Sequence, residues 1–213
     1  MSDLKQYVQD AIRTESQIDT IQVNIPNLIS ILKVYVAIGN LLDDLKKNIY
    51  YGKNINSMKW LNQLSEIITI SPTINKLPDV ADQQTLNVDP RLFHAIVGLA
   101  TESTELVEAI LKAIENETDI DHVNVQEELG DLNWYQAIAV DASDADWDKI
   151  LETNINKLKH RYPEKFTSKD AINRDLDTER QILEGVFMQA PISTHPGRLY
   201  VSPTDTALPN TDE

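Results

Sequence analysis

The chain alternates between segments in which apolar residues recur at helical spacing and short polar breaks. In the segment from 27 to 51 the apolar positions repeat every three or four residues, which places them on one face of an α-helix. The chain has only six glycines, and most of its nine prolines fall between such segments, as they do in helical proteins. This pattern predicts helices over residues 3–14, 27–51, 57–70, 91–117, 123–142, 146–162 and 168–185.

Signals for β-strands are weak along the whole sequence. It contains no Asn-Gly hairpin turn, no sustained alternation of apolar and polar residues, and no glycine-rich phosphate loop. We therefore predict an all-α fold, a helical bundle built from antiparallel helix pairs. We expect N-terminal helices and a linker over 1–90, a second helical region over 91–185, and a flexible proline-rich tail over 186–213.

The charge balance excludes several classes of function. The 213 residues carry 19 Lys and Arg against 34 Asp and Glu, a formal charge of −15, which disfavours binding to nucleic acid and suits a cation site. The absence of cysteine excludes disulfides, thiol nucleophiles and zinc–thiolate sites. The N-terminus is polar, and no apolar run approaches the roughly 20 residues of a membrane helix, so we expect a cytoplasmic protein without membrane contact.

Two acidic pairs carry the candidate chemistry. Glu102 and Glu105 are spaced i, i+3 in one predicted helix, and Glu128 and Asp131 have the same spacing in the next, so each pair lies on one helical face. If the two helices are antiparallel neighbours, the four carboxylates converge. Like charges about 4 Å apart near a protein surface repel by about 4 kcal/mol, so the cluster needs a cation. Oxygen-only ligands favour Mg²⁺ or Mn²⁺ over zinc.

A single acidic pair at this spacing is more often part of a solvated helix face. Here the pairs border apolar residues such as Leu106 and Leu129, and they are not interleaved with Lys or Arg as a salt-bridged surface would be. A di-iron carboxylate bundle would require Glu-x-x-His pairs, and no histidine in this sequence follows a Glu by three residues.

The acidic pattern and a later segment together resemble a known family. Glu-x-x-Glu, 22 residues and Glu-x-x-Asp, followed by Asn-x-x-Lys-Leu-x-x-Arg-Tyr-Pro from Asn154, are similar to the MazG-like all-α nucleoside triphosphate pyrophosphohydrolases. Residues 173–180 look like the ends of phage-type members. The resemblance covers about 91–184 and implies Mg²⁺-dependent hydrolysis of a (deoxy)nucleoside triphosphate to monophosphate and pyrophosphate. It also implies a role in nucleotide-pool control, a homodimer or homotetramer, and a host cytoplasm if the protein is phage-encoded.

The resemblance also suggests roles for individual residues. Glu102, Glu105, Glu128 and Asp131 would hold Mg²⁺, with Mn²⁺ as a substitute, and either Glu105 or Glu127 would act as general base. Asn154, Lys157 and Arg161 form one helical stripe that would contact the phosphates, although a solvated basic face fits the same spacing. The residues assigned to substrate binding are Asn154, Lys157, Arg161, Tyr162 and Tyr135.

For two ring-bearing residues, Tyr135 and His94, a structural role is an alternative to a role in the site. Tyr135 follows Asp131 by four residues and can either contact the nucleotide or belong to the core. His94 matches a frequent family histidine, but a structural histidine is the simpler interpretation.

The first half of the chain contains a degenerate copy of the second. When the sequence is shifted by 65 residues, the predicted hairpin at about 28–70 aligns with the acidic one. Three metal positions are then occupied by Ala37, Asn40 and Gln63, and only Glu66 remains acidic. We expect the first hairpin to pack on the second, complete a four-helix bundle and line part of the nucleotide pocket; the alternative is a scaffold without ligand contact.

Other functions stay open beside hydrolysis. One is a non-catalytic nucleotide or protein binder, and another is a purely structural helical bundle. A third is an enzyme similar to phosphoribosyl-ATP pyrophosphohydrolase, which shares the fold.

Overall fold

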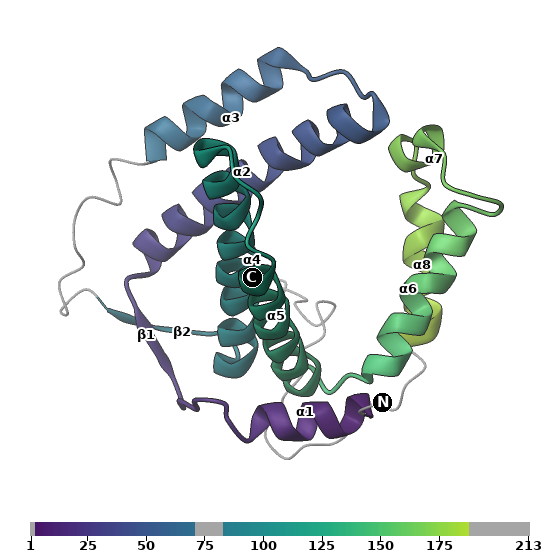
Figure 1. The fold of residues 1–213 in the computed structure, drawn as a ribbon. Helices are drawn as coiled ribbons and strands as arrows, with labels where there is room; N and C mark the ends of the chain where they lie inside the picture. The colour runs from purple at the N-terminus through teal and green to yellow at the C-terminus, as the bar shows by residue number, and fades with distance from the viewer. Residues whose placement is uncertain (1–2, 71–82, 188–213) are drawn as a thin grey trace, which may run out of the picture.

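The computed structural model describes residues 3–70 and 83–187, and within them the all-α prediction is confirmed (Figure 1). The helices are α1 (Leu4–Ile12), α2 (Ile25–Tyr51), α3 (Ser57–Ile70), α4 (Pro90–Asn116), α5 (His122–Ala142), α6 (Trp147–Arg161), α7 (Ser168–Ile172) and α8 (Leu176–Phe187). The tail beyond 187, including most of the segment expected to be flexible, lies outside the described residues.

Two features correct the predicted elements. A small antiparallel sheet pairs β1 (Ile21–Val23) with β2 (Gln84–Leu86), which local alternation could not reveal because each strand has three residues and its partner is distant in sequence. The helix predicted over 168–185 is two helices. Asn173 caps the end of α7, and the Asp175 side chain accepts from the backbone N–H of Thr178 at the start of α8, so local capping interrupts the helical pattern.

The observed helix bounds follow the 65-residue register. α2 and α4 both have 27 residues, and they begin and end 65 positions apart. Their N-caps are Asn24 and Asp89, and their C-caps are Gly52 and Glu117, both with left-handed backbone (φ 68° and 53°). Helices α3 and α5 also begin 65 positions apart. The two hairpins, α2–α3 and α4–α5, therefore have matching local structure.

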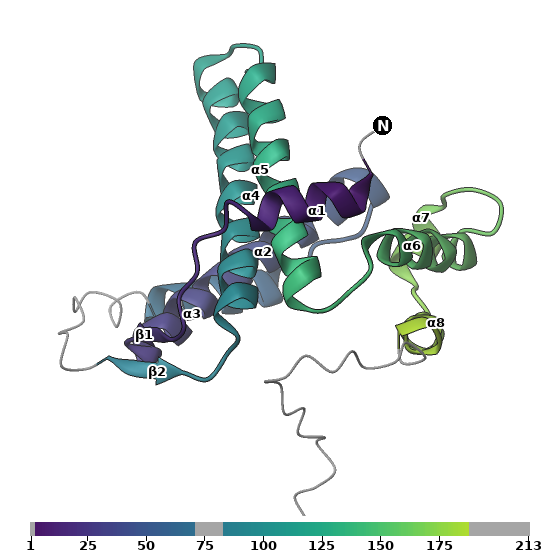
Figure 2. The same cartoon turned by 90° about the horizontal axis from the view of Figure 1, so that it is seen from below.

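The two hairpins cross each other and do not form the expected four-helix bundle (Figures 1 and 2). The β1–β2 sheet joins the segments that precede α2 and α4. At the crossing, the Tyr35 hydroxyl donates a hydrogen bond of 3.5 Å to the carbonyl of Ala100. The first hairpin thus reaches the edge of the acidic segment, two residues from Glu102, without covering its length.

Helix α1 closes the core at the other end of α5. Val8 and Ala11 pack against Ala137, and Trp134 and Trp147 pack around them. Beside this core, Arg91 at the start of α4 bridges Glu15 and Asp141, each at 2.7 Å. These contacts fix the base of the α4–α5 hairpin.

Large apolar side chains remain exposed along α2, α3 and the outer half of α4, among them Val36, Ile49 and Ile114. The expected absence of membrane contact stays a prediction. Among the described helices, α2 is long and apolar enough to cross a membrane: its most apolar 18 residues have a mean hydropathy of 1.6, and 6% of them are buried. A core helix of a larger helical assembly passes the same test, so this finding alone does not place the protein in a membrane.

Candidate metal centre

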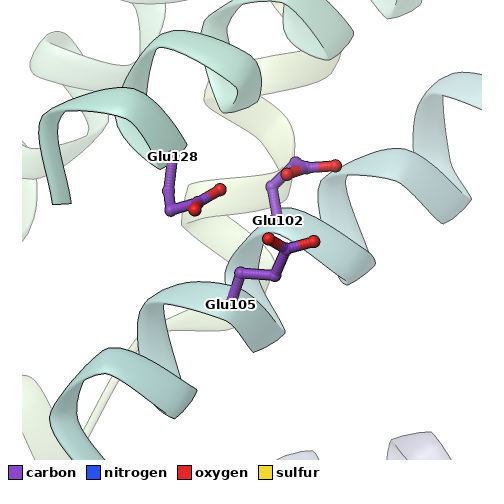
Figure 3. A group of neighbouring side chains, drawn as sticks. All are labelled: Glu102, Glu105 and Glu128. Atoms are coloured by element: carbon purple, nitrogen blue, oxygen red, sulfur yellow. The ribbon is translucent and has the colours of Figure 1, made fainter. Parts of the chain in front are cut away.

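Three of the four predicted acids converge where α4 and α5 pack together. Glu102 and Glu105 lie one turn apart on α4, and Glu128 faces them from α5 (Figure 3). One carboxylate oxygen from each residue lies within 4.8 Å of the others. The i, i+3 spacing on α4 and the antiparallel packing of the hairpin together produce this arrangement.

The cluster is partly buried and is held by short polar contacts. Glu128 is only 4% exposed, and its Oε1 accepts a 2.6 Å hydrogen bond from Asn124 Nδ2. Burial and the neighbouring Glu105 carboxylate raise the pKa of Glu102 above its usual value, while the Thr101 hydroxyl donates to Glu102 at 3.3 Å and opposes that shift. Within the described ranges, no Lys or Arg forms an ion pair with these three carboxylates.

Asp131, the fourth predicted ligand, lies outside the triad of Glu102, Glu105 and Glu128 but close to it. Its charge contributes to the raised pKa of Glu102 and to that of Tyr135. Glu127, the other predicted general base, is exposed beside Glu128 and is not part of the triad. The structure therefore brings three of the predicted acids together and leaves two at the margin.

Tyr135 lies beside the acids in a space that Gly98 leaves open. A Cβ atom at Gly98 would lie 2.1 Å from Tyr135 Cε1, so this helical position accommodates the ring only as glycine. Burial, followed by the charge of Glu102, raises the pKa of the Tyr135 hydroxyl, which therefore stays protonated at neutral pH. The rings of His94 and Trp134 meet Tyr135 edge-on, at centroid distances of 5.5 and 4.8 Å, in agreement with a structural role for His94.

The stripe predicted to contact phosphate is not brought to the triad within one chain. Asn154, Lys157 and Arg161 lie on α6, which packs against α8 and stands apart from the α4–α5 hairpin (Figure 2). Asn154 is exposed and Lys157 is half-buried. Their predicted role in substrate binding stays a prediction.

Arg161 and Tyr162 are engaged in other contacts. The Nε and Nη2 atoms of Arg161 donate to the two oxygens of Glu179, both at 2.7 Å, and Glu179 is 4% exposed. The Tyr162 ring packs on Phe166, which in turn packs on Tyr51 at the end of α2, at centroid distances of 5.4 Å. In this structure Arg161 links α6 to α8, and Tyr162 belongs to an aromatic row that reaches α2.

Sequence reasoning missed Asn124 and Gly98. Asn124 precedes Glu128 by four residues, the spacing at which two side chains on one helical face can hydrogen-bond. Gly98 precedes Glu102 by four residues inside a long helix, where glycine is unfavourable and therefore suggests a packing requirement. Both signals were present in the sequence.

A comparison with protein families identifies the same region. Residues 94–166 match the model of the MazG nucleotide pyrophosphohydrolase domain. The match includes the triad and the segment around Arg161, and it leaves the α2–α3 hairpin outside. No curated protein and no solved structure matches the chain significantly.

Proposed function

Because residues 94–166 match the model of the MazG nucleotide pyrophosphohydrolase domain, we propose that this protein hydrolyses a (deoxy)nucleoside triphosphate between its α and β phosphates. The products are the (deoxy)nucleoside monophosphate and pyrophosphate, and the biological role is control of nucleotide pools. The observation that carries this proposal is the triad of Glu102, Glu105 and Glu128, whose carboxylate oxygens lie within 4.8 Å of one another.

The donor set fits a divalent cation. Three carboxylates at this separation repel one another, and hard cations such as Mg²⁺ prefer oxygen ligands, so we propose Mg²⁺ at this site with Mn²⁺ as a substitute. When bound, Mg²⁺ would offset the charge of the phosphate oxygens and make a water molecule more acidic. Glu102, Glu105 and Glu128 would hold it, with Asp131 at the edge of the site.

The surrounding residues orient the reactants. Asn124 fixes the Glu128 carboxylate, a contact of the kind that tunes a metal ligand. Tyr135 keeps its proton and can donate it in a hydrogen bond to the bound nucleotide. Water attacks the α phosphorus, and Glu105 or Glu127 accepts its proton as the bond to the β-phosphate oxygen breaks and pyrophosphate leaves.

The phosphate-binding stripe would complete the site from another copy of the chain. Asn154 and Lys157 lie on α6, away from the triad of the same chain. We therefore propose a homodimer or homotetramer in which α6 of one subunit reaches the triad of another. Such an assembly would also cover apolar side chains that are exposed on the outer half of α4, such as Ile110 and Ile114.

Hydrolysis of the eight common NTPs and dNTPs by the purified full-length protein with Mg²⁺ tests this proposal, with products separated by anion-exchange chromatography. We expect monophosphate and pyrophosphate, and a loss of at least about 100-fold in kcat/KM for Glu105→Gln and Glu128→Gln. Glu108→Gln is the matched control, because Glu108 lies one turn further along α4, is exposed, and pairs with Lys112 at 2.8 Å.

Each other outcome of this assay contradicts the proposal in a specific way. Diphosphate and phosphate as products would place cleavage at the wrong anhydride bond. If the protein hydrolyses none of the eight nucleotides but still binds them together with Mg²⁺, the result would instead support the non-catalytic nucleotide binder.

A further inference from the structure

The α2–α3 hairpin contains a groove where its counterpart contains the acidic triad. The groove has a volume of about 330 Å³. Its lining includes Ala37, Asn40, Gln63 and Glu66, which correspond in the 65-residue register to Glu102, Glu105, Glu128 and Asp131. All four degenerate positions therefore line one concave surface.

Two contacts show that the register also describes the arrangement in space. In the sheet, Ile21 pairs with Leu86, and at the helix crossing Tyr35 contacts Ala100. Ile21 and Tyr35 thus each contact the residue that lies 65 positions further along the chain. A local two-fold axis between the hairpins produces this kind of contact, because equivalent residues meet at such an axis. The groove is therefore the pseudosymmetric counterpart of the metal centre.

The groove has lost the charge that a metal ion needs. Four carboxylates in the acidic hairpin are replaced by one, Glu66, and Lys33 brings a positive charge to the same lining. Asn40 and Gln63 supply amide groups, which both donate and accept hydrogen bonds. Apolar side chains of Ile29, Leu32 and Val36 form much of the remaining wall.

Within the described residues, two buried side-chain atoms on α3 lack a hydrogen-bond partner, Gln63 Oε1 and Trp60 Nε1. Gln63 lines the groove, and Trp60 lies one turn before it. The residue that corresponds to Asn124, the partner of Glu128, is Lys59, and its amine instead contacts Asp44 on α2 at 2.6 Å. A buried acceptor without a donor is unfavourable, so a turn of the partly exposed Gln63 side chain toward an N–H group of a ligand in the groove would satisfy it.

We propose that this groove binds a nucleoside monophosphate without a metal ion, as a second site apart from the triad. The base lies against the apolar wall, and the amides of Asn40 and Gln63 hydrogen-bond to its edge, as amide side chains do with nucleobases. Lys33 pairs with the phosphate. A single cation suits one phosphate group, whereas a triphosphate would need the metal ions that this groove cannot hold.

The choice of ligand rests on the proposed function, because a monophosphate is the product of the proposed reaction. The volume lies at the lower end of the range for small-molecule sites. Occupation by product would give the α2–α3 hairpin a regulatory role that the triad does not have.

Isothermal titration calorimetry of the full-length protein in EDTA tests this inference, with AMP, GMP, CMP, UMP and dTMP as probes. We expect one of them to bind at one site per chain, with unchanged affinity in Glu128→Gln. Gln63→Leu and Asn40→Leu should each weaken binding at least 10-fold, and Lys33→Met should weaken binding of the nucleotide but not of its nucleoside. Asn62→Leu, an exposed neighbour on α3 outside the groove lining, is the matched control.

Three results would overturn the inference. The first is that none of the probes binds in EDTA. The second is that wild type, Gln63→Leu and Asn40→Leu bind the probe with equal affinity. The third is that Gln63→Leu has a different mass from wild type in light scattering, which would identify the groove as a subunit interface. The two proposals fail separately. Hydrolysis without metal-free binding rejects only the second site, and metal-free binding without hydrolysis rejects only the enzyme.

Discussion

The contact between Arg161 and Glu179 allows a direct test of whether Arg161 is structural. Glu179 is 4% exposed and receives both Arg161, through two hydrogen bonds of 2.7 Å, and Arg174 at 2.5 Å. These two arginines lower the pKa of Glu179 from 4.5 to about 2. Glu179→Gln removes the negative charge, keeps the shape of the side chain, and leaves Arg161 without its ionic partner.

The pKa shift sets the expected size of the effect. A fall in the pKa of Glu179 from 4.5 to about 2 corresponds to about 3 kcal/mol of free energy of unfolding. Because the pKa is lower in the folded state, this stability is fully present above pH 4.5. It is lost as the pH falls from about 4.5 to about 2.

Urea unfolding followed by circular dichroism measures this difference. At pH 7, Glu179→Gln should lower the free energy of unfolding by about 3 kcal/mol, and the difference from wild type should shrink as the pH approaches 2. Arg180→Ala is the matched control on the same helix, because the Arg180–Glu184 pair is exposed and should contribute under about 0.5 kcal/mol.

Enzyme kinetics give the result that would refute this reasoning. If Arg161 is structural, Arg161→Lys should lower stability while KM for the nucleotide changes less than about threefold. Unchanged stability together with a KM raised tenfold or more would place Arg161 at the substrate and make its contact with Glu179 incidental.

Three further predictions concern the metal centre and the assembly. Gly98→Ala should lower the free energy of unfolding by about 1–3 kcal/mol in thermal denaturation and weaken Mn²⁺ binding, because the new methyl group displaces Tyr135. Gly130→Ala, whose added Cβ meets nothing within 4 Å, should be neutral or stabilising. Asn124→Ala should weaken Mn²⁺ binding 10- to 100-fold in calorimetry, and equal affinity would exclude Asn124 as a support for Glu128. Light scattering should give two or four times the mass of the 24.1 kDa chain, and a monomer at micromolar concentration would reject assembly of the site between subunits.

The sequence predicts well where a feature is determined by neighbouring residues. Helices α2 to α6 begin within two residues of their expected positions, because capping residues such as Asp121 and Asp146 specify each start locally. The acidic triad follows from the same local spacing once α4 and α5 pack against each other. These features need only the periodicity of one hairpin.

Features that depend on distant residues were not predictable in the same way. The spacing of Arg161 on α6 fits a phosphate-binding stripe, but its buried partner Glu179 lies on another helix and competes for the same guanidinium. The repeat suggested a four-helix bundle, yet helical periodicity specifies which face is apolar and not the angle at which two hairpins meet. The strand pairing of Ile21 with Leu86 spans a large part of the chain and has no local signal.

The crossing at Tyr35 and Ala100 has a mechanical consequence for the metal centre. Glu102 lies about 3 Å along the helix axis from this crossing, whereas the end of α4 at Asn116 lies about 24 Å away, at 1.5 Å per residue. If the two hairpins rotate like scissor blades about this pivot by about 10°, the tip travels about 4 Å and Glu102 about 0.5 Å. Because all three carboxylates belong to the α4–α5 hairpin, such a rotation leaves their mutual geometry unchanged, and Glu102 keeps nearly the same position relative to the first hairpin.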